Sequence, residues 1–347
     1  MHRGNGARRR ATLKAITSYL PPGVLTNQQL AEELGGWDAQ KILEKTGIAV
    51  RHIAAPEECS SDLGVAAAKR LFAKGACRPD EIDFLLFCTQ TPDYFLPTTA
   101  CLLQDRLGLR QDCGALDFNQ GCSGFVYGLA LAKSLIETGN AERLLLITAE
   151  TYSKFINRRD RSVRTIFGDG AAAALLTAVE SEKELIGPFI FGTDGRGASE
   201  LIVPAGGMRL PVGCEQTAET EDERGNWRSQ RNLYMNGSEV YRFTVETVPR
   251  LLEQLLEKSG RQVEEVDHFI FHQANKFMLE RLRARTPIPE EKFWIDLESS
   301  ANTVSSTIPI ALEKAVCHGR IRAGDSLALV GFGVGYSWAA AMMEWVG

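Results

Sequence analysis

The sequence predicts an α/β fold that is built twice, and two observations indicate it. Short apolar segments alternate with amphipathic ones, which favours parallel-type sheets covered by helices on both faces. In addition, 79–90 (PDEIDFLLFCTQ) aligns with 263–274 (VEEVDHFIFHQA) at an offset of 267 − 83 = 184 residues. Both segments run from acidic residues into an apolar strand, which ends at Cys88 in one and His272 in the other. We therefore expect two equivalent halves whose sheets enclose helices.

The repeat continues downstream, where 121–150 matches 301–333 at nearly the same offset. Each half then supplies a strand, a helix, a second strand, a helix opened by a polar residue and a third strand. We expect an N-terminal half over 12–180 and a C-terminal half over 181–347. The basic residues 1–11 are expected to form a disordered tail rather than a targeting signal, because no apolar segment follows them.

The composition is that of a soluble globular protein and disfavours several functional classes. A net charge of −5 does not indicate a nucleic-acid binder, and apolar runs such as 171–179 are too short to cross a bilayer. Eight cysteines occur without a CxxC pair or a Cys/His metal-ligand spacing. We therefore expect free thiols, no metal site and a cytoplasmic location. The acidic and then basic segment 214–232 is expected to be a surface excursion between the halves.

A cysteine between glycines is the most unusual local feature. Gly121 and Gly124 bracket Cys122, and apolar residues recur at helical spacing from Phe125 onward. Cys122 is therefore expected on a strand-to-helix turn, where unpaired N–H groups and the helix dipole stabilise a thiolate. For an isolated cysteine of this kind, a simple packing role is the alternative.

The duplication brings further residues to this cysteine. Cys122 and Asn302 hold equivalent places, since 302 − 122 = 180, and His272 follows the equivalent strand. A thiolate can take an acyl group from a thioester, and the glycines of 331–335 (GFGVG) favour a close backbone N–H for the oxyanion, although a tight turn is the other interpretation. His272 and Asn302 form either a base with its orienting partner or two donors to an enolate oxygen.

Several motifs occur in a fixed order along the chain: SYLPPGVLTNQQLA (18–31), KTGIAVRHIA (45–54), GCSGF (121–125), FGDGAAA (167–173), HQAN (272–275), ANTVSSTIP (301–309) and GFGVG (331–335). With these motifs the chain resembles the β-ketoacyl-acyl-carrier-protein synthase III family of the thiolase superfamily, from about residue 12 to the C-terminus. The resemblance implies a thiolase-like duplicated fold, with two mixed sheets enclosing buried helices in five layers. It also implies a homodimer.

The same resemblance implies a decarboxylating Claisen condensation of an acyl thioester primer with malonyl-carrier protein, in fatty-acid or related acyl-chain biosynthesis. Cys122 takes the acyl group, and His272 and Asn302 bind the malonyl thioester oxygen. The backbone N–H groups of Cys122 and Val334 form the oxyanion hole, and 167–170 (FGDG) forms a supporting turn. No cofactor is implied; acyl-CoA or acyl-carrier protein and malonyl-carrier protein are substrates.

Substrate-binding positions follow from the resemblance, with departures. Lys45 and Arg161 match basic positions on the adenine side of coenzyme A. The family has a tryptophan at the position of Lys41 and an arginine at that of Phe277, so delivery of the primer by carrier protein stays open. Trp37 lies four residues before Lys41, and the sequence leaves open whether its ring takes the place of the missing tryptophan.

The carrier-protein surface is expected to be basic. It would comprise Arg242, Lys276, Arg281, Arg283 and Arg285. A merely solvated charged helix is the alternative. Leu96, before Pro97, matches an acyl-pocket gate that the family supplies from the partner subunit, and its aliphatic side chain would admit a different or longer acyl group than phenylalanine does.

Two other functions compete with condensation. In one, the acyl group passes from Cys122 to an alcohol or amine, in secondary metabolism or surface-polysaccharide modification. In the other, the chain is an inactive subunit that pairs with a paralogue. The intact set of Cys122, His272 and Asn302 disfavours the inactive subunit, whereas the departures at Lys41 and Phe277 keep acyl transfer open.

Overall fold

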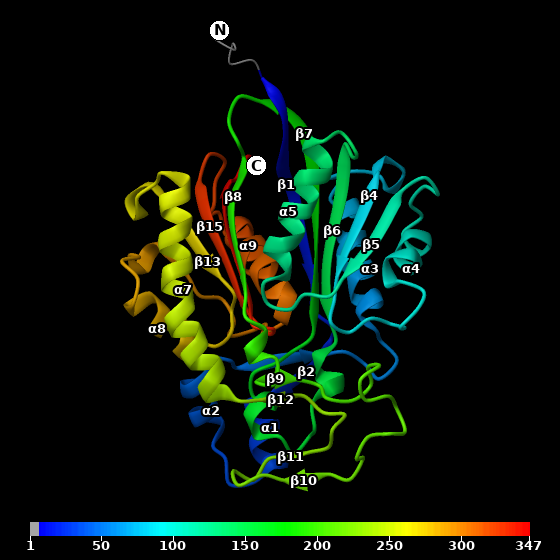
Figure 1. Cartoon of the computed structure of the whole chain (residues 1–347), viewed down its shortest axis with the longest axis vertical. Coiled ribbons are helices and arrows are strands. Elements are labelled where there is room, and N and C mark those ends of the chain that lie inside the picture. The colour runs from blue at the N-terminus through cyan, green and yellow to red at the C-terminus, as the bar shows by residue number, and fades with distance from the viewer. Residues whose placement is uncertain (1–6) are drawn as a thin grey trace.

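The structure, a computed structural model, describes residues 7–347 and consists of two five-stranded sheets with helices between and outside them (Figure 1). The strand order is β1-β7-β6-β4-β5 in the first sheet and β14-β13-β15-β16-β8 in the second. Read from β1 and from β8, the two orders are equivalent. The predicted layers of helix, sheet, helix, sheet and helix are confirmed.

Both sheets are mixed. The first comprises β1 (Arg8–Tyr19), β4 (Phe84–Cys88), β5 (Gly114–Phe118), β6 (Arg143–Glu150) and β7 (Gly170–Ser181). The second comprises β8 (Ile186–Thr193), β13 (His268–Phe271), β14 (Phe293–Trp294), β15 (Ser326–Gly333) and β16 (Ser337–Glu344). The expectation of parallel-type sheets is wrong for one strand of each, because β7 runs antiparallel to its neighbours β6 and β1, and β16 runs antiparallel to β15 and β8. The mixed sheets that the resemblance implied are confirmed.

The long helices occupy equivalent places in the two halves. The two between the sheets are α5 (Gly124–Glu137) and α9 (Thr307–Cys317). The outer ones are α3 (Ser60–Ala73) and α4 (Thr99–Arg106) on the first sheet, and α7 (Gly237–Ser259) and α8 (Lys276–Ala284) on the second. Because α5 is buried between the two sheets, its apolar residues are distributed around most of the helix circumference, as expected for a central helix.

Paired hydroxyl groups fix the starts of the two central helices. Ser123, before α5, contacts Ser337 of β16 with 2.9 Å between the oxygens. Ser306, before α9, contacts Thr148 of β6 at the same distance. All four side chains are buried, so an unmade bond at either place would cost the desolvation of a hydroxyl group. Each central helix is therefore fixed at its N-terminal end to the sheet of the opposite half.

Short elements gather at the lower end of the view in Figure 1. They are β2 (Gly23–Thr26), α1 (Asn27–Leu34), α2 (Ala39–Thr46), β3 (Val50–Ile53), α6 (Arg161–Arg164), β9 (Leu201–Ile202), β10 (Thr220–Glu221), β11 (Trp227–Arg228) and β12 (Tyr234–Met235). The expected position of 214–232 between the halves is wrong, because β8 of the second sheet precedes it. The segment is an excursion within the second half.

The first strand begins earlier than expected. Arg8, Arg9 and Arg10 pair with β7, and Arg9 donates from Nε to the carbonyl oxygen of Ile136 at 2.6 Å. Ala11 is fully buried. The expectation of a disordered tail is therefore wrong for residues 8–11, whose arginines hold the sheet against α5. Residues 1–6 lie outside the described residues.

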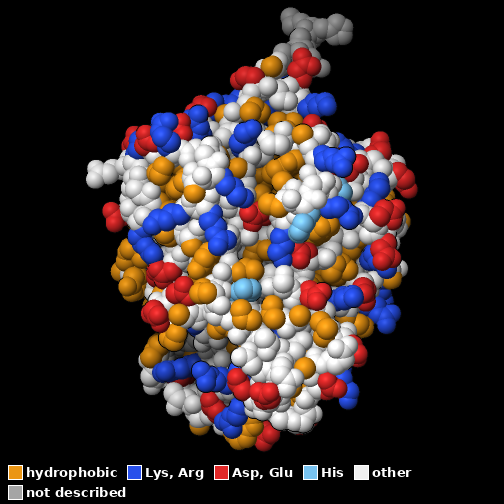
Figure 2. All heavy atoms as spheres, turned by 180° about the vertical axis from the view of Figure 1, so that it is seen from behind, with side chains coloured by type: hydrophobic (Ala, Val, Ile, Leu, Met, Phe, Trp, Pro, Cys, Tyr) orange, Lys and Arg blue, Asp and Glu red, His pale blue; other side chains and the backbone are white. Residues whose placement is uncertain are grey.

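Charges of both signs are mixed on the face that Figure 2 shows, where Lys and Arg side chains lie among Asp and Glu side chains. This face carries no continuous basic stripe of the kind that nucleic-acid binding uses. Within residues 7–347, no helix has the length and apolar character needed to cross a membrane.

Candidate active site

A cavity of about 460 Å³ lies where the central helices begin, and Cys122, His272 and Asn302 all line it. Cys122 occupies the turn between β5 and α5, His272 follows β13 directly, and Asn302 precedes α9. The three side chains are at most 5% exposed. The convergence of these three positions, expected from the duplication, is present in the structure, whereas their chemical roles remain proposals.

Glycines allow the sulfur of Cys122 to sit against the end of β15. A Cβ added at Gly333 would lie 2.7 Å from Cys122 Sγ, and one at Gly331 would lie 2.7 Å from Ser123 Cα. Burial raises the pKa of the Cys122 thiol, and the backbone N–H groups of Val334 and of Cys122 itself act against that shift. The two N–H groups expected to hold an oxyanion therefore lie close to this sulfur.

The imidazole of His272 is held from both sides. Its Nδ1 lies 2.7 Å from Thr307 Oγ1, and that hydroxyl donates to the carbonyl oxygen of Val304 at 3.1 Å. The hydroxyl has one hydrogen, so two arrangements fit these distances: the hydroxyl donates to Val304 and Nδ1 carries the imidazole proton, or it donates to Nδ1 and Nε2 carries it. In the first arrangement Nε2 is free to accept a proton. The ring of Phe332 meets the imidazole edge to face, with 5.5 Å between centroids. Nothing in the sequence singled out Thr307 beyond its place in the 301–309 motif.

Asn302 is oriented by its own loop. Its Oδ1 accepts from the N–H of Val304 at 2.9 Å, so Nδ2 faces the Nε2 of His272 at 3.5 Å and the Ala274 carbonyl oxygen at 3.4 Å. Ala301 and Val304 have φ angles of 59° and 55°. A β-branched residue with positive φ is strained, which is common where a site over-determines the backbone.

The segment 167–170 supports Asn302, as the sequence suggested. The N–H of Gly168 donates to the Asn302 carbonyl oxygen at 3.0 Å, and the Asn302 N–H donates to Ile166 at 3.1 Å. The buried carboxylate of Asp169 accepts from the N–H groups of Ala54 and Ser153 at 2.8 and 2.9 Å. Burial raises the pKa of Asp169, and these donors oppose that shift.

Burial makes the resting pair uncharged. It raises the pKa of Cys122 to about 12, and the negative charge of Glu150 acts in the same direction. Burial also lowers the pKa of His272 to about 3. Burial therefore opposes the stabilised thiolate that the sequence suggested, and the N–H groups of Val334 and Cys122 act in its favour. A buried thiol faces a neutral imidazole, and the thiol must lose its proton as it attacks.

Glu150, at the end of β6, is a buried carboxyl group that the sequence did not reveal. It accepts hydrogen bonds from Ser305 at 2.8 Å, from Thr91 at 3.2 Å and from the N–H of Gln90 at 3.0 Å. Burial raises its pKa to about 8 in spite of these donors. Glu150 therefore links β6, the loop after β4 and the turn before α9.

The structure brings the two adenine-side residues together with Trp37. Lys45 Nζ lies 5.9 Å from the centroid of the Trp37 ring, and Arg161 Cζ lies 6.0 Å from it. Arg161 also donates to the Leu34 carbonyl oxygen at 2.8 Å. Trp37 therefore occupies the place beside both cations, whereas Lys41 is an exposed residue of α2.

Three other expected residues do not line this cavity. Arg242 pairs with Glu239 and faces a separate polar hollow beside Tyr336. Lys276 lies near Glu280, with 3.8 Å between Nζ and a carboxylate oxygen, and lines a hollow against α2. Leu96 is 81% exposed. Contact with a carrier protein or a partner subunit remains open to all three.

Comparison with known proteins identifies the family. Residues 116–195 match the family described as 3-oxoacyl-[acyl-carrier-protein] synthase III, and residues 256–345 match the family described as the C-terminal part of that enzyme. The β-ketoacyl-[acyl-carrier-protein] synthase III of Caldanaerobacter subterraneus is 38% identical over 328 residues, which are 94% of this chain and 96% of that protein. The chain belongs to the β-ketoacyl-acyl-carrier-protein synthase III family.

Other synthase III proteins share both sequence and fold with this member of the family. Synthase III 3 of Streptomyces coelicolor is 38% identical and covers 97% of this chain and 98% of its own. A crystal structure of a 3-oxoacyl-(acyl-carrier-protein) synthase III superposes with a TM-score of 0.96 at 53% identity, over 97% of this chain and all of that one. The Pseudomonas aeruginosa structure gives 0.84 at 32%, over 97% and 99% of the two chains.

The residues that the structure describes contain no group of three or more His, Cys, Asp or Glu side chains arranged to hold a metal ion. The groups at hand are a thiol, an imidazole, a carboxamide and backbone N–H donors. This set suits acyl transfer through a thioester.

Replacing Gly333 by alanine is expected to displace the Cys122 sulfur, because the new Cβ would overlap it. A shift of about 1 Å at a reacting atom can cost about 100-fold in rate, so acylation of Cys122 should slow by 10-fold or more. Intact-mass spectrometry over time measures this. Gly207→Ala, where an added Cβ meets nothing within 4 Å, is the control. Unchanged acylation of Gly333→Ala would contradict the assigned contact.

Replacing Glu150 by glutamine is expected to change the pH dependence of stability. The folded state holds the Glu150 proton up to about pH 8, whereas an ordinary glutamate releases it near 4.5. The parent should therefore lose stability as pH rises between these values, by at most about 1.4 kcal/mol per pH unit from this group. The variant should not lose this contribution.

Urea unfolding of parent and variant at pH 5, 6.5 and 8 measures the difference. Glu57→Gln, at an exposed glutamate, should show no such trend. A difference between Glu150→Gln and the parent that stays constant across this range would refute a raised pKa.

Proposed function

We propose that the chain catalyses the decarboxylating condensation of an acyl thioester primer with malonyl-carrier protein, with Cys122, His272 and Asn302 as the catalytic residues. The observation that carries this proposal is that a thiol packed against the backbone at Gly333 shares one cavity with a neutral imidazole and an oriented carboxamide. The thiol and the backbone N–H groups suit acyl transfer, and the imidazole and the carboxamide suit hydrogen bonding to an enolate oxygen.

In the acylation step, the Cys122 thiol attacks the carbonyl carbon of the primer thioester while its proton moves to Nε2 of His272. The N–H groups of Cys122 and Val334 bind the oxyanion. Collapse of this intermediate breaks the carbon–sulfur bond of the donor, and the leaving thiolate takes the proton back from Nε2. The neutral His272 with its proton on Nδ1 is the form that this step needs.

In the condensation step, the malonyl thioester loses CO2 and the bonding electrons form an enolate. Nδ2 of Asn302 donates to the enolate oxygen. His272 donates as well in the tautomer that carries its proton on Nε2, which forms when Nε2 takes a proton from solvent and Nδ1 releases one to solvent; the Thr307 hydroxyl then turns from Val304 and donates to Nδ1. The enolate carbon attacks the acyl-cysteine, and the released Cys122 thiolate takes up one proton, which its high pKa favours.

The reacting groups are those of the substrates and the Cys122 thiol, and the proposed reaction uses no bound cofactor. We propose acyl-CoA or acyl-carrier protein as the donor, with Lys45 and Arg161 on the adenine side, and Arg242 and Lys276 on the carrier-protein surface. The eight cysteines are free thiols, which is typical of a reducing compartment and supports a cytoplasmic location.

A homodimer is proposed because one edge of the first sheet has features of an interface. β5 is the last strand of that sheet, and its Leu116 is 46% exposed. The neighbouring Tyr94, Phe95 and Leu96 are 61%, 73% and 81% exposed. Asp117 of β5 accepts from the N–H of Thr99 at 2.6 Å, which keeps this apolar segment beside the strand. An unpaired edge with an apolar patch suits pairing with a second copy.

Asn302→Ala is expected to separate the two half-reactions. Acylation needs no enolate and should be retained, whereas loss of one enolate donor should slow release of CO2 from malonyl-carrier protein by about 10² to 10³. Single-turnover acylation is followed by mass, and CO2 release from labelled malonyl-carrier protein is followed in parallel.

Two cysteine variants control this experiment. Cys122→Ser should gain no acyl mass, whereas Cys101→Ser, at an exposed cysteine, should behave like the parent. Parental CO2 release by Asn302→Ala would remove Asn302 from the mechanism. A parent that acylates Cys122, releases no CO2 and passes the acyl group to an alcohol or amine would replace condensation by acyl transfer.

Leu96→Phe is expected to shift acceptance toward short acyl groups, because a larger partner side chain narrows the acyl pocket. The ratio of acylation rates for acetyl and longer acyl donors measures the shift. Val212→Phe, at another exposed aliphatic residue, should leave the ratio unchanged. An unchanged ratio for Leu96→Phe, or a monomer by sedimentation, would argue against the gate.

A further inference from the structure

The excursion 214–232 contains a hairpin whose charges the condensation chemistry does not use. β10 and β11 pair antiparallel, and the N–H of Gly225 donates to the Asp222 carbonyl oxygen at 2.9 Å to close the turn. Gly225 has a φ of 79°, which a residue with a side chain rarely adopts. The turn thus has a defined shape, and it carries Glu223 and Arg224 at its tip.

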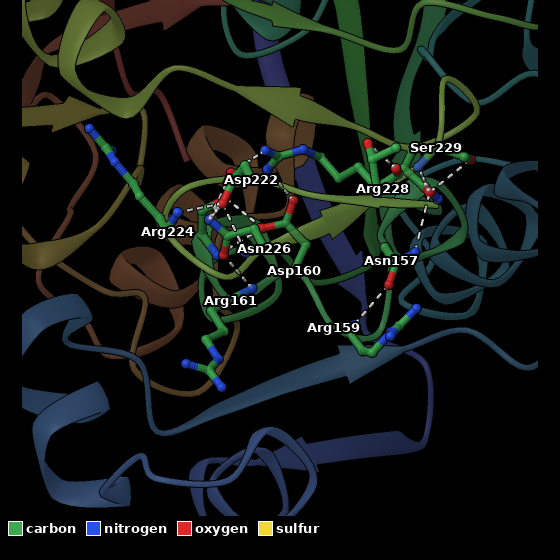
Figure 3. Close-up of polar contacts among 12 residues, drawn as sticks. Asn157, Arg159, Asp160, Arg161, Asp222, Arg224, Asn226, Arg228 and Ser229 are labelled. Atoms are coloured by element: carbon green, nitrogen blue, oxygen red, sulfur yellow. Dashed lines mark hydrogen bonds and ion pairs between the residues drawn. The ribbon is translucent and has the colours of Figure 1, made fainter. Parts of the chain in front are cut away.

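A buried ion pair fixes this hairpin to the body of the protein. Arg228 of β11 contacts Asp160 at 2.7 Å, and the Asp160 carboxylate is fully buried. Arg228 also pairs with Asp222, and the side chain of Asn226 accepts from the N–H of Arg161 at 3.1 Å (Figure 3). Asp222 and Asn226 lie two residues before and after Arg224, so both flanks of the tip are held.

A second set of contacts holds the other side of the hairpin. Arg159 pairs with Glu219, and its guanidinium lies 4.0 Å from the centroid of the Trp227 ring. Asn157 donates to Glu219 at 2.7 Å. Cation–π contact and ion pairing together hold the hairpin against the segment before α6. Arg159 and Arg228 are therefore structural residues with carboxylate partners.

Arg224 differs from Arg159 and Arg228 in having no carboxylate partner among the described residues. Within residues 7–347, its guanidinium has no ion-pair or hydrogen-bond partner, and its backbone N–H donates to Asp222 at 2.9 Å. In Figure 3 its side chain extends away from the paired groups. It is exposed, and it lines the same cavity as Cys122. Among the described residues that line this cavity, Arg224 is the one whose side chain is charged at neutral pH, since His272 is neutral there.

We propose that Arg224 binds the phosphate at the end of the phosphopantetheine arm of the thioester substrates. This inference rests on the proposed function, which places a thioester at Cys122. The pantetheine arm is uncharged, as are the other side chains that line the cavity shared by the buried Cys122 and the exposed Arg224, including Phe277 and Tyr241. The phosphate follows the arm, and a guanidinium binds phosphate through two parallel hydrogen bonds.

The hairpin is already held at both flanks, so binding of the phosphate does not have to order the backbone around Arg224. The entropic cost of the contact is therefore lower. The same phosphate occurs in acyl-CoA and in acyl-carrier protein. Arg224 would therefore act on both donors, whereas the adenine-side residues Lys45 and Arg161 would act on acyl-CoA alone.

The test compares Arg224→Ala with the parent on substrates that differ only in this phosphate. Binding of 4′-phosphopantetheine and of pantetheine is measured by calorimetry, and acylation of Cys122 by acyl-phosphopantetheine and acyl-pantetheine is measured by mass. The parent should prefer the phosphorylated molecule, and the variant should lose about 10-fold to 100-fold of that preference, as for a charge-assisted contact. Arg224→Lys should lose less. Acyl-CoA and acyl-carrier protein, used as donors, should both be affected.

Arg209→Ala is the matched control, because Arg209 is an exposed arginine of the same region and does not line the cavity. It should retain the parental preference. A preference that Arg224→Ala retains, or an equal loss for phosphorylated and unphosphorylated molecules, would overturn the proposal. The binding measurement needs no chemistry, so a parent that binds 4′-phosphopantetheine through Arg224 but is never acylated would reject the proposed function and leave this contact standing.

Discussion

The close approach of the β15 end to Cys122 is the contact on which the site depends. Gly331 and Gly333 leave no room for side chains, and they allow the Val334 N–H to reach the sulfur. This approach joins the two halves of the chain, because Cys122 belongs to the first and β15 to the second. The N-terminal end of α5 is held by the same contact, and the Ser123–Ser337 bond lies beside it. The fold and the site therefore share one constraint.

Burial at this junction then decides the protonation states. Desolvation favours a neutral thiol and a neutral imidazole, and hydrogen bonds choose which nitrogen of His272 carries the proton. Thr307 is central to that choice, since its hydroxyl can donate either to Val304 or to the ring. Burial of Cys122 and His272 also strengthens nearby N–H donors toward an oxyanion. The same burial therefore disfavours a resting thiolate and suits the proposed acylation step.

Charged side chains play a different part outside the core. In the excursion 214–232 Arg228 and Glu219 are paired and hold a hairpin in place, and in β1 Arg9 and Arg10 hold a strand against α5. From composition alone, the excursion and the N-terminal arginines are predicted to be mobile or peripheral, because runs of charged residues are usually solvated. Their partners, Asp160 and the carbonyl oxygens of Ile136 and Ala141, lie far away in sequence. Composition alone therefore did not reveal their structural role.

The sequence by itself determined the duplicated α/β architecture and the convergence of Cys122, His272 and Asn302, because apolar periodicity and internal repetition are local properties of the chain. It also indicated the close backbone approach at 331–335, since glycine allows it. Only the tertiary structure decided the antiparallel return of β7 and β16, the place of the excursion, the burial of the Cys122–His272 pair and the positions of Thr307, Glu150 and Arg224. Those features depend on burial and on partners distant in sequence, and desolvation and long-range hydrogen bonds arise only when the chain is folded.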